Sequence, residues 1–107
     1  MKLITQDFEK LFEKYPLYSQ EENSDPLVVA KLFNPCGSET WYLTEYSPED
    51  KTAFGFVTGL GADELGYVSL QELEEIPLPL GLTIERDLYF SPKSLSECCK
   101  TAVKMAD

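Results

Sequence analysis

The sequence predicts an α+β domain in which a small, mainly antiparallel sheet carries N-terminal, middle and C-terminal helices. Several segments rich in aromatic and β-branched residues follow one another with only short turns between them, as expected for adjacent strands. An amphipathic segment precedes these strands, and S-x-x-E capping boxes at Ser69 and Ser94 mark the starts of two further helices. Strands joined by short turns pair antiparallel, so we expect the helices to pack on one side of the sheet.

The chain has 107 residues, which is enough for a single domain spanning residues 1–107. A hydrophobic content of 43% argues against disorder, despite a net charge of −10. No apolar run is long enough to cross a membrane, and the first residues lack the apolar core of a signal peptide. The cysteines are odd in number and two of them, Cys98 and Cys99, are adjacent, which favours a reduced compartment. We therefore expect a cytoplasmic protein without a membrane partner.

The first helix is expected over residues 6–14, because apolar side chains follow helical spacing there. Thr5 is placed to cap its N-terminus, and Pro16 ends it. An acidic loop over residues 19–26 follows, and the near-continuous apolar run at 27–33 predicts the first strand.

A second strand is expected at residues 40–46, after a turn at 34–37. Simple alternation places two sets of side chains on opposite faces: Trp41, Leu43 and Glu45 on one, and Tyr42, Thr44 and Tyr46 on the other. Of the neighbours Trp41 and Tyr42, one should therefore be buried and the other exposed. An exposed aromatic ring bordered by acidic residues would serve as a contact for another protein.

The central stretch, residues 53–74, predicts a strand, a glycine loop, a short strand and a helix. Phe54 and Phe56 share one face of the strand at 53–58. Glycines at 59 and 61 permit a sharp turn, residues 66–68 are again extended, and the middle helix begins after Ser69.

The C-terminal part begins at Pro77 and Pro79, which end the middle helix. A last extended segment is expected at residues 83–90, followed by a helix that opens at Ser94. The predicted buried face of that helix consists of Leu95, Cys98, Cys99, Ala102 and Met105 or Ala106.

Several common chemistries find no support in this sequence. The chain has no histidine, which removes the commonest general base and the commonest zinc ligand. The G-x-G-x-x-G phosphate-binding pattern fails because Glu64 stands at the third glycine position, so a structural turn is the favoured interpretation of this loop. The cysteines lack C-x-x-C spacing, and buried small residues are a better interpretation of Cys98 or Cys99 than metal ligands. We predict no catalytic residue, cofactor or metal.

Negative charge is concentrated in the middle of the chain. Residues 15–50 and residues 60–90 each hold seven acidic residues against one basic residue. Nucleic acids and anionic membranes would be repelled by such a chain, so we expect no direct binding to DNA or RNA.

Five carboxylates could in principle converge as a metal-dependent hydrolase site: Glu45, Asp63, Glu64, Glu85 and Asp87. A solvated acidic surface is the simpler interpretation. Arg86, the only arginine, lies between two of these acids, and we expect it to form a structural ion pair with Glu45 or Asp63.

Three segments together resemble one bacterial family, the domain of unknown function 2958. They are VVAKLFNPCGSETWYLTEYSPED, FGFVTGLGADELGYVSLQELE and PLGLTIERDLYF, and the resemblance extends from Lys2 to Leu95. It implies a small stand-alone or appended domain carried by plasmids, integrative elements or phages, often near antirestriction genes. The family offers no established catalytic residues to transfer to this chain.

Two hypotheses of function follow. In the first, the chain is a protein-interaction module that binds a basic nucleic-acid-binding protein or a defence enzyme, and in a stronger form it mimics DNA to block that enzyme. The candidate contact residues are Trp41, Tyr42, Glu45, Asp63, Glu64, Glu85, Arg86 and Asp87. In the second, Asp63, Glu64 and the region from Glu85 to Asp87 hold a divalent metal in a small hydrolase.

Overall fold

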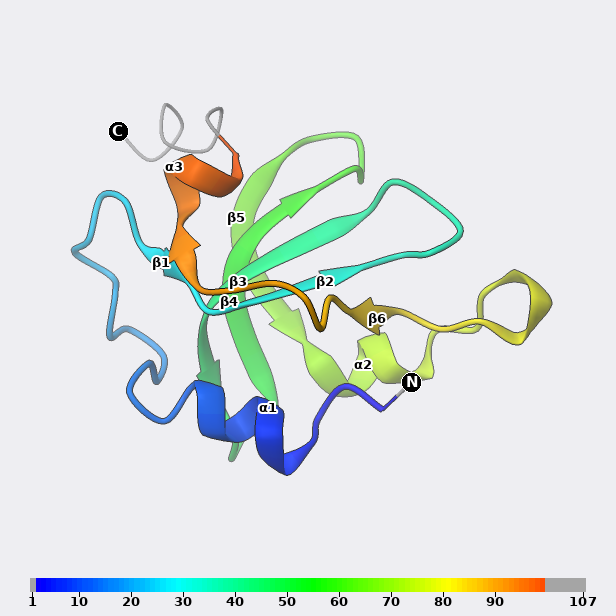
Figure 1. Cartoon of the computed structure of the whole chain (residues 1–107), viewed down its shortest axis with the longest axis horizontal. Helices are drawn as coiled ribbons and strands as arrows, with labels where there is room; N and C mark the ends of the chain where they lie inside the picture. The colour runs from blue at the N-terminus through cyan, green and yellow to red at the C-terminus, as the bar shows by residue number, and fades with distance from the viewer. Residues whose placement is uncertain (1, 100–107) are drawn as a thin grey trace.

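A computed structural model describes residues 2–99 and shows an α+β fold built on an antiparallel sheet (Figure 1). The five strands of the main sheet lie in the order β5 (Glu64–Ser69), β4 (Thr52–Thr58), β3 (Thr40–Ser47), β2 (Ala30–Phe33) and β6 (Glu85–Arg86). A separate pair joins β1 (Leu27–Val28) to β7 (Lys93–Ser94). Every pairing between the strands described within residues 2–99 is antiparallel, which confirms the predicted α+β class with its mainly antiparallel sheet.

The helices are short: α1 (Gln6–Leu11), α2 (Leu70–Glu75), a 3-10 turn η1 (Pro79–Gly81) and α3 (Leu95–Cys98). The two predicted caps of α1 and α2 form, with Thr5 Oγ1 accepting from the amide of Phe8 at 3.1 Å and Ser69 Oγ from that of Glu72 at 3.2 Å. None of the helices between residues 2 and 99 is both long and apolar enough to span a bilayer.

Within the described residues, the last predicted helix is present as α3, from Leu95 to Cys98. Ser94 is the N-cap of α3, but its hydroxyl donates to the Glu97 carboxylate at 3.0 Å instead of capping a backbone amide. The rest of the prediction, from Ala102 to Met105 or Ala106, lies outside the described residues.

Three predicted elements are shorter than expected. The helix expected over 6–14 ends at Leu11, because the amides of the next residues bond carbonyls three positions back and form turns. The strand expected over 27–33 divides at Val29, whose amide still bonds Leu43 O at 2.8 Å while β1 pairs with β7. Only two residues of the extended segment 83–90 join the sheet, since an Asp87 carboxylate oxygen accepts the Tyr89 amide and turns the chain.

A β-bulge interrupts the pairing of β3 with β4. Leu43 lies opposite Gly55 and Glu45 lies opposite Phe54, so Thr44 is an extra residue with no partner position. The bulge shifts the alternation by one residue, as bulges do. The predicted faces are therefore wrong beyond Leu43: Tyr46 packs in the cluster that holds Trp41 and Leu43, and Glu45 faces the side of Phe54.

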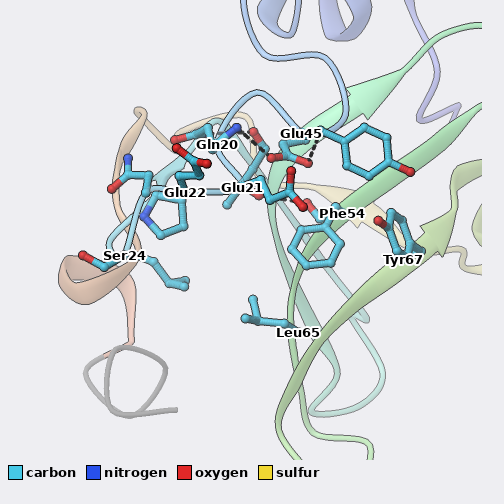
Figure 2. A pocket seen from close by; sticks show the side chains of 13 residues that line it. Gln20, Glu21, Glu22, Ser24, Glu45, Phe54, Leu65 and Tyr67 are labelled. Carbon is cyan, nitrogen blue, oxygen red and sulfur yellow. Dashed lines mark hydrogen bonds between the residues drawn. The ribbon is translucent and has the colours of Figure 1, made fainter. Parts of the chain in front are cut away.

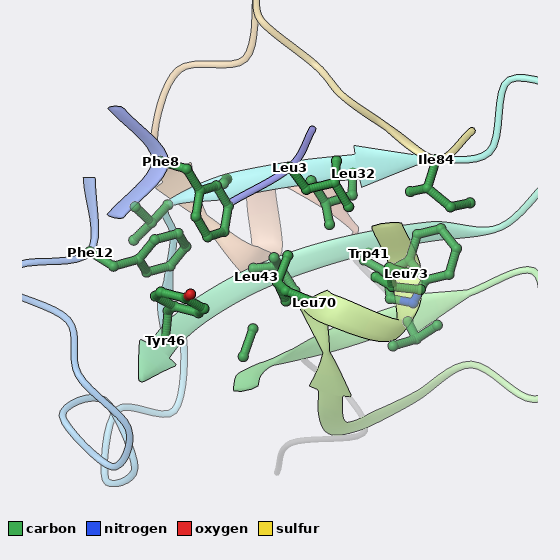
Figure 3. Packing of buried hydrophobic residues seen from close by; sticks show 14 residues of the cluster. Leu3, Phe8, Phe12, Leu32, Trp41, Leu43, Tyr46, Leu70, Leu73 and Ile84 are labelled. Atoms are coloured by element: carbon green, nitrogen blue, oxygen red, sulfur yellow. The ribbon is translucent and has the colours of Figure 1, made fainter. Parts of the chain in front are cut away.

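The larger hydrophobic core covers one face of the sheet (Figure 3). Phe8 of helix α1 and Phe12 at its C-cap belong to this core, as do Leu70 and Leu73 of α2. The Tyr46 ring meets that of Phe8 edge-on, with ring centroids 5.1 Å apart. Since edge-to-face packing adds to the free energy of burial, this aromatic contact holds α1 on the sheet.

A smaller cluster contains Val28 of β1, Phe56 of β4 and Leu95 of α3. Phe56 and its neighbour Val57 point to opposite faces of β4, and Val57 belongs to the larger core. The expectation that the three helices pack on one side is therefore not confirmed, because α3 packs with the smaller cluster. Helix α3 covers only part of the sheet face that carries the smaller cluster, and the pocket described below lies on the same face, with Leu95 in its lining.

Gly55 allows the close approach of β3 and β4 beside the bulge. A Cβ atom at this position would collide with the backbone carbonyl of Tyr42 and lie 2.9 Å from Leu43 Cα. Gly66, the cross-strand partner of Gly55, has open space where a Cβ would be.

We predict that Gly55→Ala lowers the free energy of unfolding by about 1–3 kcal/mol, the usual cost of forcing extra volume into a packed region. Gly66→Ala is the matched control and should change stability by less than about 0.5 kcal/mol, as surface changes usually do. Urea denaturation of both variants measures this, and equal losses would contradict the proposed backbone approach.

A second prediction concerns alkaline stability. Burial, followed by the Glu9 carboxylate that accepts the Tyr46 hydroxyl at 3.3 Å, raises the pKa of Tyr46. The unfolded chain therefore releases this proton first, so the contribution of Tyr46 to stability is complete below about pH 10 and is lost above it. Denaturant titrations at pH values below and above about 10 should show that the free energy of unfolding falls less with rising pH for Tyr46→Phe than for the native chain. An equal fall in both proteins would contradict the assignment.

Candidate functional site

The second face of the sheet holds a pocket of about 370 Å³, which we call the sheet pocket (Figure 2). Strands of the sheet form one wall, and the loop before β1 forms the other. In Figure 2 Glu21, Glu22 and Ser24 lie on the loop side and Phe54, Leu65 and Tyr67 on the sheet side. The full lining is Tyr18, Gln20, Glu21, Glu22, Asn23, Ser24, Pro26, Thr44, Glu45, Phe54, Leu65, Tyr67 and Leu95.

Glu45 lines this pocket and is only 4% exposed. The bulge at Thr44 turns the Glu45 side chain toward the loop. There one carboxylate oxygen accepts the backbone N–H of Tyr18 and the other accepts the backbone N–H of Gln20, both at 2.8 Å. A buried carboxylate requires such donors, because burying the charge alone would be costly. Glu45 therefore anchors the loop to the sheet.

Gln20 makes the second connection between loop and sheet. Its side-chain nitrogen donates to Leu27 O at 2.9 Å and to Thr44 O at 2.8 Å, while its oxygen accepts the Leu27 amide at 2.7 Å. These bonds occupy both amide hydrogens and one oxygen lone pair, and they tie the loop to β1 and to the bulge. The loop wall of the pocket is thus fixed by side chains and not by a strand.

Three aromatic rings line the pocket. Tyr67 of the edge strand β5 is 58% exposed, and its ring lies 5.0 Å from that of Phe54 in an edge-on arrangement. Tyr18 is 62% exposed and has a left-handed backbone with φ of 73°, a conformation that non-glycine residues rarely adopt. Since Glu45 accepts the Tyr18 amide, the same carboxylate that anchors the loop also holds this ring at the pocket.

The electrostatic character of the pocket is negative. A hydrogen bond with the Tyr18 side chain is the main cause that raises the pKa of Tyr67, followed by loss of hydration and by the carboxylates of Glu45 and Glu21. Negative charge beside a phenol disfavours its anionic form. The raised pKa therefore reports mainly the contact between the Tyr18 and Tyr67 side chains, to which Glu45 of β3 and Glu21 of the loop add smaller contributions.

Trp41 and Tyr42, the aromatic residues predicted as contacts, differ in their burial. Trp41 is buried in the larger core at 6% exposure, and Tyr42 packs half-buried against the smaller cluster. Burial raises the pKa of Tyr42, with the neighbouring Cys99 and Cys98 as lesser causes. The strongly exposed tyrosines of residues 2–99 are instead Tyr18, Tyr67 and Tyr89.

The carboxylates predicted as a hydrolase site do not come together. Asp63 and Glu64 lie at the start of β5, whereas Glu85 and Asp87 lie at β6, the opposite edge of the sheet. Four strand spacings separate these edges, about 19 Å at ~4.8 Å per spacing. No group of three or more histidine, cysteine or acidic side chains within residues 2–99 is arranged to hold a metal ion.

Two of these acidic residues have local structural contacts. Asp63 accepts the amide of Gly59 at 3.3 Å, closing the glycine loop in which Gly59 has a φ of 88°. Asp87 lies 3.8 Å from Lys31 Nζ. The glycine loop thus has the features of a turn, and its own carboxylate takes an amide that a phosphate would need.

The predicted ion pair of Arg86 is wrong in its partner. Arg86 pairs with Asp7 at 2.7 Å, and its guanidinium also lies 6.0 Å from the centroid of the Phe8 ring. The two expected partners belong to other parts of the sheet. Glu45 lies on β3, two strands away from β6, and Asp63 precedes β5 at the opposite edge. Arg86 therefore connects β6 to helix α1.

The cysteines are free thiols. Cys36 is exposed, whereas Cys98 and Cys99 are half-buried and pack against the smaller cluster. Burial raises the pKa of Cys98, which keeps its thiol protonated and poorly nucleophilic at neutral pH.

Sequence reasoning missed Tyr18, Gln20 and Tyr67. Tyr67 follows Leu65 at strand spacing, so the two share one face of β5, where Tyr67 lies opposite Phe54 and Leu65 lies opposite Phe56. That signal was present in the sequence. No sequence signal identified Tyr18 and Gln20, because their positions depend on the bulge at Thr44 and on contacts more than twenty residues apart.

Fold and site together define a small α+β domain with an acidic, aromatic pocket on one face of an antiparallel sheet. A family model described as "Protein of unknown function (DUF2958)" matches residues 3–107, and the chain belongs to this family. The match confirms the resemblance found in the sequence. Comparison with curated proteins and with solved structures gave no match.

We predict that Glu45→Gln lowers the free energy of unfolding by about 1–3 kcal/mol, because an amide cannot accept from both backbone donors and leaves one buried amide unsatisfied. The exposed Glu49 provides the matched control, and Glu49→Gln should leave stability within about 0.5 kcal/mol of the native chain. Thermal denaturation measures both. If Glu45→Gln were as stable as the control, Glu45 would not be the anchor of the loop.

Proposed function

We propose that this chain is a protein-interaction domain of bacterial mobile elements that acts in the cytoplasm. Its partner is a basic protein, such as a nucleic-acid-binding protein or a defence enzyme. The sheet pocket is the observation that carries the proposal, because it is a hollow with exposed aromatic rings and acidic side chains. Aromatic residues exposed beside a pocket are typical anchors of protein interfaces.

The charge of the chain supports a basic partner. The net charge is −10, and Lys31 and Arg86 are already in contact with Asp87 and Asp7. The electric field of such a negatively charged chain increases the rate of encounter with a positively charged protein, and it repels bare nucleic acid. A narrower form of the proposal is DNA mimicry, in which the acidic surface occupies the DNA-binding groove of a restriction or defence enzyme.

The proposal predicts a specific pattern of capture from host lysate. The tagged native chain should retain a basic protein at low salt and lose most of it at high salt, since salt screens exposed charges. The double variant Glu21→Gln/Glu22→Gln, at the pocket, should retain several-fold less of that same protein, identified by mass spectrometry.

The matched control is Glu72→Gln/Glu75→Gln, which removes the same charge from exposed positions on α2, away from the pocket. It should retain the partner nearly as well as the native chain. Capture that ignores both salt and the pocket variant would contradict the proposal. Duplex DNA added to the captured complex tests the narrower form, because a DNA mimic should be displaced by DNA.

A further inference from the structure

We infer that the sheet pocket binds the guanidinium group of an arginine side chain supplied by the partner protein. This inference rests on the proposed function and specifies the chemistry that the pocket recognises. It is carried by the combination of exposed aromatic surface, unneutralised carboxylates and a preformed cavity in one place.

Aromatic surface is the first requirement of a guanidinium site. Tyr18 of the loop and Tyr67 of β5 are each more than half exposed, and a hydrogen bond joins their side chains. The Phe54 ring lies beside Tyr67. Cations are attracted to aromatic faces, and arginine makes this contact more often than lysine. The chain places three rings within reach of one bound group.

Charge is the second requirement. Three of the thirteen lining residues are glutamates, Glu21, Glu22 and Glu45, and none is lysine or arginine. Neither Glu21 nor Glu22 takes part in the ion pairs of Lys31 and Arg86. The pocket therefore has negative charge that its own lining residues do not neutralise, and a cation would supply the missing partner.

Preorganisation is the third requirement. The side chains of Glu45 and Gln20 fix the loop wall through hydrogen bonds to backbone groups, between 2.7 and 2.9 Å long, so the pocket does not have to form upon binding. A volume of about 370 Å³ is at the small end of ligand sites, large enough for one long side chain. A fixed site of this size loses little entropy when a side chain enters.

Guanidinium fits these features better than ammonium. It is planar, more weakly hydrated than ammonium, and able to stack on a ring while it donates several hydrogen bonds to carboxylates. Glu21 and Glu22 are exposed glutamates at the loop wall, opposite the rings of the sheet wall. One flat group can therefore contact both walls.

The test is a titration of the isotope-labelled chain with Nα-acetyl-arginine amide, followed by amide chemical shifts. We expect saturable shifts centred on Tyr18, Leu65 and Tyr67, with millimolar affinity. Nα-acetyl-citrulline amide has nearly the same shape without the charge, and should give little shift. Equal shifts from citrulline, or arginine shifts centred elsewhere, would overturn the inference.

Three variants refine this test. Tyr67→Leu removes an aromatic face and should weaken arginine binding about two- to fivefold, the effect of an exposed cation–π contact. Glu21→Gln/Glu22→Gln should weaken it by at least as much. Tyr89→Leu changes a tyrosine that is 97% exposed and lies outside the sheet pocket, so its affinity should match the native chain.

The amide spectrum of each variant shows whether it remains folded. A folded Tyr67→Leu that binds arginine with native affinity would overturn the inference. The titration needs no partner protein, so its result is independent of the lysate capture. Arginine binding with no captured partner would refute the interaction module alone, whereas capture without arginine binding would refute only the guanidinium site.

Discussion

The burial of one carboxylate organises the face of the sheet that holds the sheet pocket. The extra residue Thr44 shifts β3 so that Glu45 faces the loop and not the larger core, and the carboxylate then binds two loop amides. Buried charge is tolerated only where donors surround it, so loop and sheet are required to keep one relative position. The pocket, its loop wall and the exposed ring of Tyr18 all depend on this contact.

The sequence predicted the parts of the fold that depend on local rules. Caps at Thr5 and Ser69, the turn around Gly59 and the antiparallel order of the strands each follow from residue types over a few positions. Alternation along β3 correctly placed Trp41 and Tyr42 on opposite faces, because both residues precede the bulge, although Tyr42 is half-buried and not exposed as expected. These predictions needed no knowledge of distant contacts.

The failures have a common physical cause. A bulge is defined by the pairing with the partner strand, where Gly55 lies opposite Leu43 in close backbone contact, and nothing in residues 40–46 alone reveals it. Once the alternation shifts, Glu45 changes from an expected surface contact to a buried anchor. The ion pair of Arg86 with Asp7 likewise joins residues 79 positions apart, a distance over which local patterns carry no information.

The position of β5 at one side of the sheet has a further consequence, for solubility. A strand with one neighbour presents unpaired amides and carbonyls that can recruit the strand of another molecule, the first step toward fibrillar aggregation. This strand is preceded by Asp63 and begins with Glu64, both exposed, and like charges would face each other if two copies aligned there. The acidity of the chain therefore also helps to keep separate molecules apart at the concentrations found in a cell.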